Sequence, residues 1–259
     1  MKIAIIGAGN KGGAIARGLA KGTIVKVEDI CVANPTLGKL NALKAEFPAI
    51  QTTCSNVEAA KCADIVLLAV KPWLVESVIK ELSLDAENQI LVSVAAGITF
   101  AQLEECVGGQ MAIFRIIPNT AISQLESMTL IAGHRATCEQ SQLMVDIFNE
   151  MGLAMLIPES QMAATTALTS CGIAYVLKYI QAAMQAGIEM GVYPKDAQRM
   201  VAQSVKGAAS LILNNDTHPS IEIDKVTTPG GITIRGINEL EHEGFVSAVI
   251  KAMKSSYVK

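Results

Sequence analysis

The chain has 259 residues, with 21 Lys and Arg against 24 Asp and Glu, which gives a formal net charge of −3. Hydrophobic residues make up 51% and charged residues only 17%, so the chain can bury a large core and is not intrinsically disordered. A slightly negative chain without a cluster of basic residues is a poor match for nucleic acid or anionic lipid. The shortage of charge also indicates that part of the outer surface is covered, so we predict an oligomer.

The sequence favours a cytoplasmic protein with no membrane partner. The first residues hold one Lys and a very short apolar run before glycines, which does not resemble a signal peptide. The uncharged stretch 160–177 is too rich in Ser, Thr, Gly and Gln for a membrane span. The six cysteines form no C-x-x-C pair and the three histidines are scattered, so we expect free thiols in a reducing compartment and no metal site.

The first 157 residues alternate short apolar runs with helical patterns. Apolar runs that are buried on both faces and separated by helices predict an α/β fold with a Rossmann-type, doubly wound parallel sheet. The expected strands are 2–6, 30–33, 65–69, 90–94, 112–116, 129–132 and 154–157. Helices expected between them include 10–21, 37–47 and 140–151.

Residues 158–259 have a different pattern, without a convincing strand. Long Ala-, Met- and Gln-rich segments are broken near 191–194, 216–219 and 227–231. Lys178 is the only charged residue between 160 and 188, although a surface helix needs a polar face. We therefore predict an all-α domain over 158–259 that dimerises, following the nucleotide-binding domain 1–157.

A glycine-rich turn follows the first expected strand, which ends at Ile6. Such a turn lets the backbone approach a pyrophosphate, whose charge is stabilised by the start of the next helix. The context of strand, turn and helix is the one that the G-x-G-x-x-G motif requires. The expected cofactor contacts in this turn are Gly7, Ala8, Gly9, Asn10, Lys11 and Gly12.

The second strand ends in Asn34, where an enzyme specific for NAD would carry an acidic residue that binds the ribose 2′-hydroxyl. No carboxylate repels a 2′-phosphate here and Lys39 is close, so we predict NADP. The ends of the next strands complete the dinucleotide site, because the carboxyl ends of parallel strands line the ligand crevice. They supply Ala69, Val70, Lys71 and Pro72, followed by Ala95, Ala96 and Gly97.

A second candidate site lies near the C-terminus. Thr228 as N-cap and Pro229 at the first helical position predict a helix start. Gly230 and Gly231 would leave backbone N–H groups open to a carboxylate or phosphate, with the Thr233 hydroxyl beside them. Reduction of a ketone usually needs a proton donor such as His, Tyr or Lys, whereas a protonated imine accepts hydride directly. The scarcity of acid and base motifs therefore favours reduction of a C=N bond.

These residues resemble the pyrroline-5-carboxylate reductase family. The most specific match is VTTPGGITIRGINELE at 226–241, and the supporting matches are GAGNKGG, AVKP at 69–72, AAG at 95–97, RIIPNT at 115–120 and Asn56 before the third predicted strand. The resemblance covers essentially the whole chain. It implies NADPH-dependent reduction of 1-pyrroline-5-carboxylate to L-proline, the last step of proline synthesis.

The resemblance also implies a homodimer, often within a larger ring of dimers, with the active site at the subunit interface. The cofactor of one chain would meet the helix start of the other, with the substrate carboxylate on the backbone around Gly231 and Ile232. Thr233 would hydrogen-bond the ring nitrogen as the catalytic residue. Substrate contacts at Thr228, Gly230 and Glu159 and a cofactor contact at Asn56 follow from the same resemblance.

The chain departs from the family pattern at 170–175, where GSGPAY is usual and this sequence reads SCGIAY. This departure leaves catalytic efficiency and substrate range open. Two alternatives to the leading interpretation are a reductase of another small cyclic imino acid and a non-catalytic NADP-binding dimer.

Overall fold

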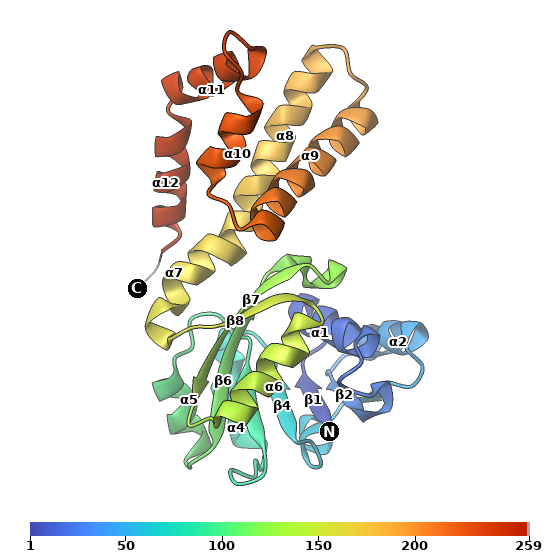
Figure 1. Cartoon of the computed structure of the whole chain (residues 1–259). Coiled ribbons are helices and arrows are strands. Elements are labelled where there is room, and N and C mark those ends of the chain that lie inside the picture. Colours follow the sequence, from blue (N-terminus) through green and yellow to red (C-terminus); the bar gives the residue numbers. More distant parts are fainter. Residues whose placement is uncertain (258–259) are drawn as a thin grey trace. The chain divides into compact units, whose positions relative to one another are not determined.

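The computed structural model describes residues 1–257, which form two compact units, one from Met1 to Ser170 and one that begins at Cys171 (Figure 1). The first unit extends beyond the boundary expected after residue 157. Helix α7 (Met162–Thr166) contacts strand β7 of this unit, and Met162 is buried in its core. The first unit therefore ends past the last strand of its sheet.

The first unit is built on one eight-stranded sheet in the order β3-β2-β1-β4-β5-β6-β7-β8. The order of the first six strands is that of a Rossmann fold, with the topological switch between β1 and β4. Strands β1, β4, β5 and β6 are buried throughout. The strands are β1 (Ile3–Ile6), β2 (Ile30–Ala33), β3 (Gln51–Thr53), β4 (Ile65–Leu68), β5 (Ile90–Ser93), β6 (Ala112–Pro118), β7 (Ser127–His134) and β8 (Gly152–Leu156).

All seven expected strands are present, and the sheet is parallel as expected except at one pair. Strand β7 pairs antiparallel with β6, and β8 then pairs parallel with β7. The segment 119–126 between β6 and β7 is too short for the crossover of about a dozen residues that parallel strands need. Strand β3 was not predicted, because it is a three-residue edge strand without the buried apolar pattern of the others.

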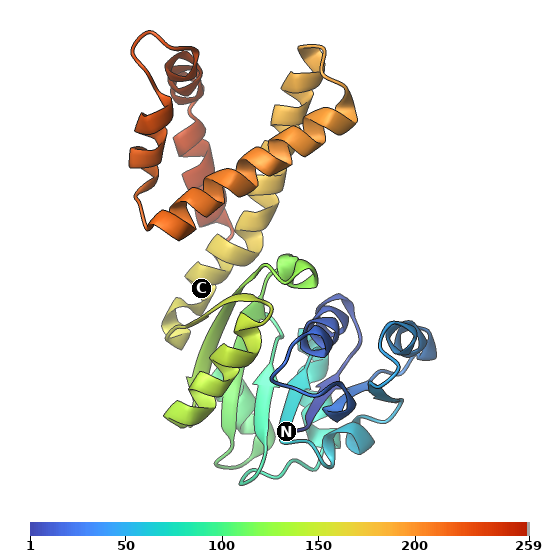
Figure 2. The ribbon, with the colours of Figure 1, turned by 45° about the vertical axis from the view of Figure 1, so that its right-hand side comes forward.

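Helices cover both faces of this sheet (Figures 1 and 2). One buried cluster joins it to α1, α2 and α6, and the other joins it to α3, α4 and α5. The predicted helix 10–21 is confirmed, and the other two predicted helices shift by one or two residues at their ends. The helices are α1 (Asn10–Lys21), α2 (Leu37–Glu46), α3 (Asn56–Ala60), α4 (Val75–Glu81), α5 (Phe100–Val107) and α6 (Cys138–Asn149).

The second unit contains helices and no strand in its described residues. Three of its breaks fall where the sequence predicts them, and a fourth, at residues 243–244 between α11 and α12, was not predicted. Its helices are α8 (Gly172–Glu189), α9 (Pro194–Asn215), α10 (Pro219–Val226), α11 (Ile232–His242) and α12 (Phe245–Ser255). Helices α8 and α9 pack together, and the Tyr175 hydroxyl in α8 donates to the Ala252 carbonyl in α12 at 3.2 Å. Gly172 and Ala197 are the only buried residues among 171–257, so this unit has almost no core of its own.

Within the described residues, none of the helices combines the length and the apolar character that crossing a membrane requires.

Candidate active site

The glycine turn between β1 and α1 is shaped by two glycines that leave no room for a side chain. A Cβ atom at Gly7 would lie 2.7 Å from the Ala69 carbonyl oxygen, and one at Gly12 would lie 1.9 Å from the Gly7 carbonyl oxygen. Gly7 also has a φ of +106°, which favours glycine. At Gly9, by contrast, a Cβ would meet no atom within 4 Å. Gly7 and Gly12 therefore fix the turn, and Gly9 leaves open space beside it.

The start of α1 offers backbone donors to an anion. Gly9 is the N-cap residue and supplies no side-chain hydrogen bond, so the first N–H groups of the helix have no side-chain partner. A phosphate placed there would also be stabilised by the helix dipole. The turn thus fits the pyrophosphate that the sequence predicts.

Asn34 makes hydrogen bonds within the protein, and the cofactor contact expected of it stays a prediction. Its side chain is buried, accepts from the Ala8 backbone N–H at 3.0 Å and donates to the Thr36 hydroxyl at 2.7 Å. These bonds fix the glycine turn to the segment after β2. Asn34 therefore supports the site as a structural link between two loops.

Three basic side chains, from Lys11, Lys39 and Arg17, lie around the crevice. Lys11 Nζ donates to the Val94 carbonyl at the end of β5, at 3.3 Å. Two effects lower the pKa of Lys11: the larger is desolvation of the ammonium by burial, and the smaller is the charge of Lys71. The Arg17 guanidinium is held by Glu46 through bonds of 2.7 and 2.6 Å. These cations suit a phosphorylated dinucleotide.

A cavity of about 650 Å³ in the first unit brings part of the predicted cofactor site together. The predicted residues on its lining are Ala8, Gly9, Asn10, Lys11, Lys39 and Ala96. Sequence reasoning missed several others, among them Arg17, Pro118, Asn119, Thr120, Thr166 and Ser170. Arg17 follows Gly13 by one helical turn on α1, a spacing that could have revealed it.

The other predicted cofactor residues lie outside this lining. Ile6 and Ala95 are buried, Ala69 and Val70 are partly buried behind the glycine turn, and Lys71 and Gly97 are exposed. Asn56 at the start of α3 donates to Glu81 at 3.1 Å. Pro72 lines a separate hollow with Trp73. For these residues cofactor binding stays a prediction.

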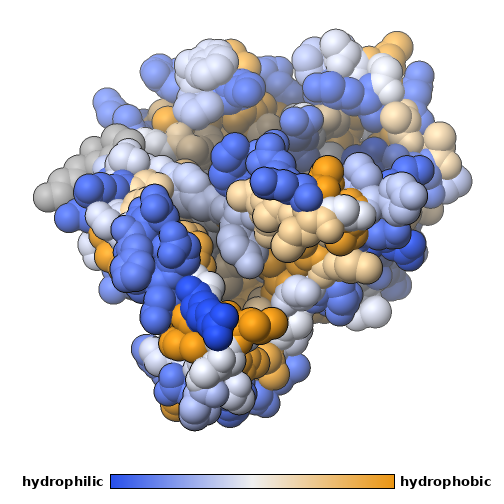
Figure 3. Space-filling view, turned by 90° about the horizontal axis from the view of Figure 1, so that it is seen from above, coloured by the Kyte–Doolittle hydropathy of each residue, from blue (hydrophilic) through white to orange (hydrophobic). Residues whose placement is uncertain are grey.

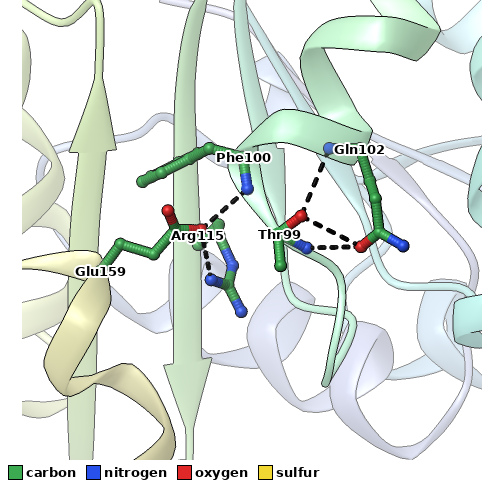
Figure 4. A network of polar contacts seen from close by, with 5 residues as sticks. All are labelled: Thr99, Phe100, Gln102, Arg115 and Glu159. Atoms are coloured by element: carbon green, nitrogen blue, oxygen red, sulfur yellow. Dashed lines mark hydrogen bonds and ion pairs between the residues drawn. The ribbon is translucent and has the colours of Figure 1, made fainter. Parts of the chain in front are cut away.

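The Glu159 side chain links two elements of the first unit, β6 and α5 (Figure 4). Its Oε1 accepts from Arg115 Nη1 at 2.6 Å and from the Phe100 backbone N–H, the first of α5, at 2.8 Å. Arg115 lies on β6 and is only 7% exposed, so Glu159 neutralises a buried cation. This structural role was not anticipated, and the substrate contact expected of Glu159 stays a prediction.

The segment before α11 is a turn, so the helix start predicted at Thr228 was wrong. The Gly231 N–H donates to the Thr228 carbonyl at 2.9 Å, and Gly230 has a φ of +72°. Pro followed by a glycine with positive φ is typical of a type II turn. The helix begins three residues later, with Gly231 as N-cap and no side-chain cap. Ile232 and Thr233 are therefore its first residues, and both are exposed.

Two family models together match most of the chain. Residues 159–259 match pyrroline-5-carboxylate reductase dimerisation, and residues 2–97 match NADP oxidoreductase, coenzyme F420-dependent. A curated relative, pyrroline-5-carboxylate reductase 2 of Dictyostelium discoideum, is 39% identical over 99% of this chain and 91% of its own length. The chain belongs to the pyrroline-5-carboxylate reductase family.

Solved structures of this family share the fold along the whole chain. A pyrroline-5-carboxylate reductase from Coxiella burnetii, 30% identical, superimposes with a TM-score of 0.90 over 99% of this chain and 96% of its own. The Plasmodium falciparum pyrroline carboxylate reductase with NADP bound is 28% identical. It superimposes with a TM-score of 0.87 over 99% of this chain and 95% of its own. Pyrroline-5-carboxylate reductase 1 of Dictyostelium discoideum is longer, and this chain spans 48% of it.

The glycine turn and the basic side chains around it fit the NADP of the pyrroline-5-carboxylate reductase family. Gly9 leaves open space for a phosphate, and Lys11, Arg17 and Lys39 are cations on the lining of one cavity. Among residues 1–257, no group of three His, Cys, Asp or Glu side chains is placed to hold a metal ion.

Proposed function

We propose that this protein reduces the C=N bond of 1-pyrroline-5-carboxylate to give L-proline, with NADPH as the reductant. The observation that carries the proposal is the similarity to pyrroline-5-carboxylate reductases along the whole chain. In this proposal the glycine turn before α1 and the turn before α11 would supply the two binding sites that this reaction needs.

The first unit would hold the cofactor. The backbone around Gly9 and the first N–H groups of α1 would bind the pyrophosphate. Lys39 would bind the 2′-phosphate, since it is a cation on the cavity lining, whereas the Arg17 guanidinium is paired with Glu46. When bound, NADPH supplies the hydride that reduces the imine carbon.

The start of α11 would hold the substrate. Because Gly231 donates its N–H within the turn, we assign the carboxylate to the free N–H groups of Ile232 and Thr233. Thr233 is the second residue of the helix, so its hydroxyl lies in the first turn and can orient the ring nitrogen. Thr228 and Gly230 shape the turn that presents these donors.

The cavity lining supports imine chemistry. It includes no His, Tyr, Cys, Asp or Glu, and we assign its lysines, Lys11 and Lys39, to the cofactor, so no side chain of the lining is left as the acid for a ketone oxygen. A protonated imine needs none, because hydride addition to the carbon yields the amine directly. The chain would then have to orient the imine rather than protonate it.

Helix α11 of one subunit would complete the cofactor site of the other in a homodimer. The match of residues 159–259 to the family's dimerisation model supports the homodimer. We further propose a ring of such dimers in the cytoplasm, in keeping with six free cysteines. Light scattering behind size exclusion would give the number of subunits, and a mass of one dimer would contradict the ring.

The test of function is loss of absorbance at 340 nm with purified protein, synthetic 1-pyrroline-5-carboxylate and either NADPH or NADH. We expect turnover with both and a higher rate with NADPH, because Lys39 attracts the 2′-phosphate. Measurable NADPH binding without turnover would contradict 1-pyrroline-5-carboxylate as the substrate and favour either another imine or a non-catalytic NADP-binding dimer.

The variant Thr233→Ala tests the catalytic assignment. Loss of the hydroxyl that orients the ring nitrogen should lower kcat by about 10-fold or more, while the Kd for NADPH stays unchanged. Thr233→Ser keeps the hydroxyl and is the matched control. Wild-type kcat in Thr233→Ala would remove Thr233 from the mechanism.

Another small cyclic imino acid is the second candidate substrate, favoured by SCGIAY at 170–175. A six-membered cyclic imino acid in the same assay distinguishes the two. A higher kcat/KM for the larger ring would replace pyrroline-5-carboxylate as the preferred substrate.

A further inference from the structure

Ser170 lies at the end of the first unit, in a π-helical turn, Ala167–Cys171, that follows α7. It lines the same cavity as the glycine turn. Its hydroxyl oxygen is buried and has no hydrogen-bond partner among the described residues. π-helical turns are rare and often occur at functional sites.

The unpaired state of Ser170 contrasts with its neighbours. Thr165 donates to the Gln161 carbonyl at 2.8 Å, and Thr169 donates to the Thr165 carbonyl at 2.9 Å. Hydroxyls in helices commonly bond backward in this way. A buried hydroxyl without such a bond destabilises the folded chain, so its presence on a cavity wall points to a ligand that satisfies it.

The cavity around Ser170 belongs to the cofactor. Its lining combines the glycine turn, Lys39 and Ala96, whereas none of the residues 228–233 lies on it. Ala96 follows β5, where small residues are expected to leave room for the nicotinamide ring. Asn119 is on the lining as well, but its amide is occupied by bonds to Ala121 N–H and, at 3.4 Å, to the Thr169 carbonyl.

We propose that the Ser170 hydroxyl hydrogen-bonds the carboxamide of the nicotinamide ring and so fixes the rotation of that group. A hydroxyl can donate and accept, and a carboxamide offers both an acceptor and a donor. The resemblance expects glycine at this position, so the contact is a property of this chain. The inference rests on the proposed function only for the identity of the cofactor.

The experiment compares two ligands in the absence of substrate, so its result does not depend on imine turnover. NADPH binding is followed by its fluorescence, and 2′-phospho-ADP-ribose, which lacks the nicotinamide ring, is measured by competition. Ser170→Ala removes the hydroxyl, and Ser170→Cys replaces it with a weaker donor of similar size. Thr169→Ala removes the neighbouring hydroxyl, which bonds within its own helix, and is the control.

Loss of one hydrogen bond should raise the Kd for NADPH about 5-fold in Ser170→Ala and Ser170→Cys. The Kd for 2′-phospho-ADP-ribose should stay at the wild-type value in both variants, and Thr169→Ala should change neither of the two Kd values. The Tm of Ser170→Ala should not fall, because an unpaired buried hydroxyl is lost.

Three outcomes would overturn the assignment. An unchanged Kd for NADPH would show that the hydroxyl does not contact the cofactor. Equal weakening of both ligands would place the effect away from the nicotinamide. A raised KM for the imino acid with an unchanged Kd for NADPH would assign the hydroxyl to the substrate. If the proposed reaction is wrong, the wild type shows no turnover of the imino acid, but the Kd for NADPH still rises in Ser170→Ala relative to the wild type.

Discussion

At the scale of single residues, Gly9 and Gly12 of the glycine turn offer a matched pair. An alanine Cβ at Gly12 would overlap the Gly7 carbonyl, whereas one at Gly9 meets no atom within 4 Å. We expect Gly12→Ala to lower the free energy of unfolding by about 3 kcal/mol, measured by urea denaturation. Gly9→Ala should change it by less than about 1 kcal/mol.

The same pair separates stability from binding. Gly9→Ala fills the space that the pyrophosphate needs, so the Kd for NADPH should rise about 10-fold or more although the fold is intact. If Gly9→Ala binds NADPH as the wild type does, the phosphate does not lie beside Gly9.

Lys11 predicts how cofactor binding depends on pH. Burial and Lys71 lower its pKa from 10.5, so free protein loses this proton at a lower pH than an ordinary lysine. A nearby phosphate stabilises the ammonium and raises the pKa again, so binding takes up a proton on the alkaline side. The Kd for NADPH should therefore rise with pH between the lowered pKa and the pKa in the complex.

The variant Lys11→Met tests whether Lys11 causes this pH dependence, by measurement of the Kd for NADPH as a function of pH. It should bind more weakly at neutral pH and show a flatter alkaline limb, whereas Lys61→Met, on the exposed end of α3, should keep the wild-type profile. An alkaline limb that persists in Lys11→Met would assign the proton to another group.

The sequence predicted the residues of the site better than their contacts. The glycine turn was predictable because its motif requires a particular backbone. The bond that Asn34 makes back to Ala8 was not predictable, because a strand-end residue can face a ligand or bond to a neighbouring loop. Ser170 was noted only as a departure from a family pattern, since no spacing rule reveals an unpaired hydroxyl before the packing around it is known.

At the scale of elements, the Glu159 carboxylate joins β6 to the N-terminus of α5. A variant at this position distinguishes its structural role from the expected substrate contact. Glu159→Gln would leave the buried Arg115 guanidinium without its counter-charge, although Glu159 is itself 37% exposed. We expect a loss of about 2 kcal/mol in the free energy of unfolding, with little change in KM for the imine. A raised KM at unchanged stability would instead confirm the substrate contact.

Elements were predictable where burial determined them. Strands buried on both faces, such as β4, have an apolar run that the sequence shows directly. The direction of β7 depended on the length of the connection before it, and β3 is an edge strand with little burial. The start of α11 was placed too early because Thr228 and Pro229 suit a helix start and a type II turn equally well.

At the scale of the whole molecule, the second unit exposes many large apolar side chains along α8 to α12. Hydrophobic residues at the surface lie in patches among hydrophilic ones (Figure 3). Leu177 on α8 is 59% exposed and stands next to Lys178. Helical faces of this kind are typical of an obligate dimer interface.

We expect Leu177→Asp to raise the dissociation constant of the dimer about 100-fold or more, because a carboxylate would be buried without a partner. Analytical ultracentrifugation over a dilution series measures it. The neighbouring Lys178→Glu should leave the dimer intact. A Leu177→Asp dimer as tight as the wild type would exclude this part of α8 from the interface.

A helical unit in which only Gly172 and Ala197 are buried has a consequence for how the protein is made. The sheet-based unit has its own core and can fold as soon as it leaves the ribosome. The helices must await a second chain, so this stage of maturation is bimolecular and its rate rises with the square of the concentration of newly made chains. Below some level of synthesis, half-mature chains would accumulate with apolar helices open to chaperones and proteases. The yield of finished enzyme would then rise more steeply than in direct proportion to gene dosage.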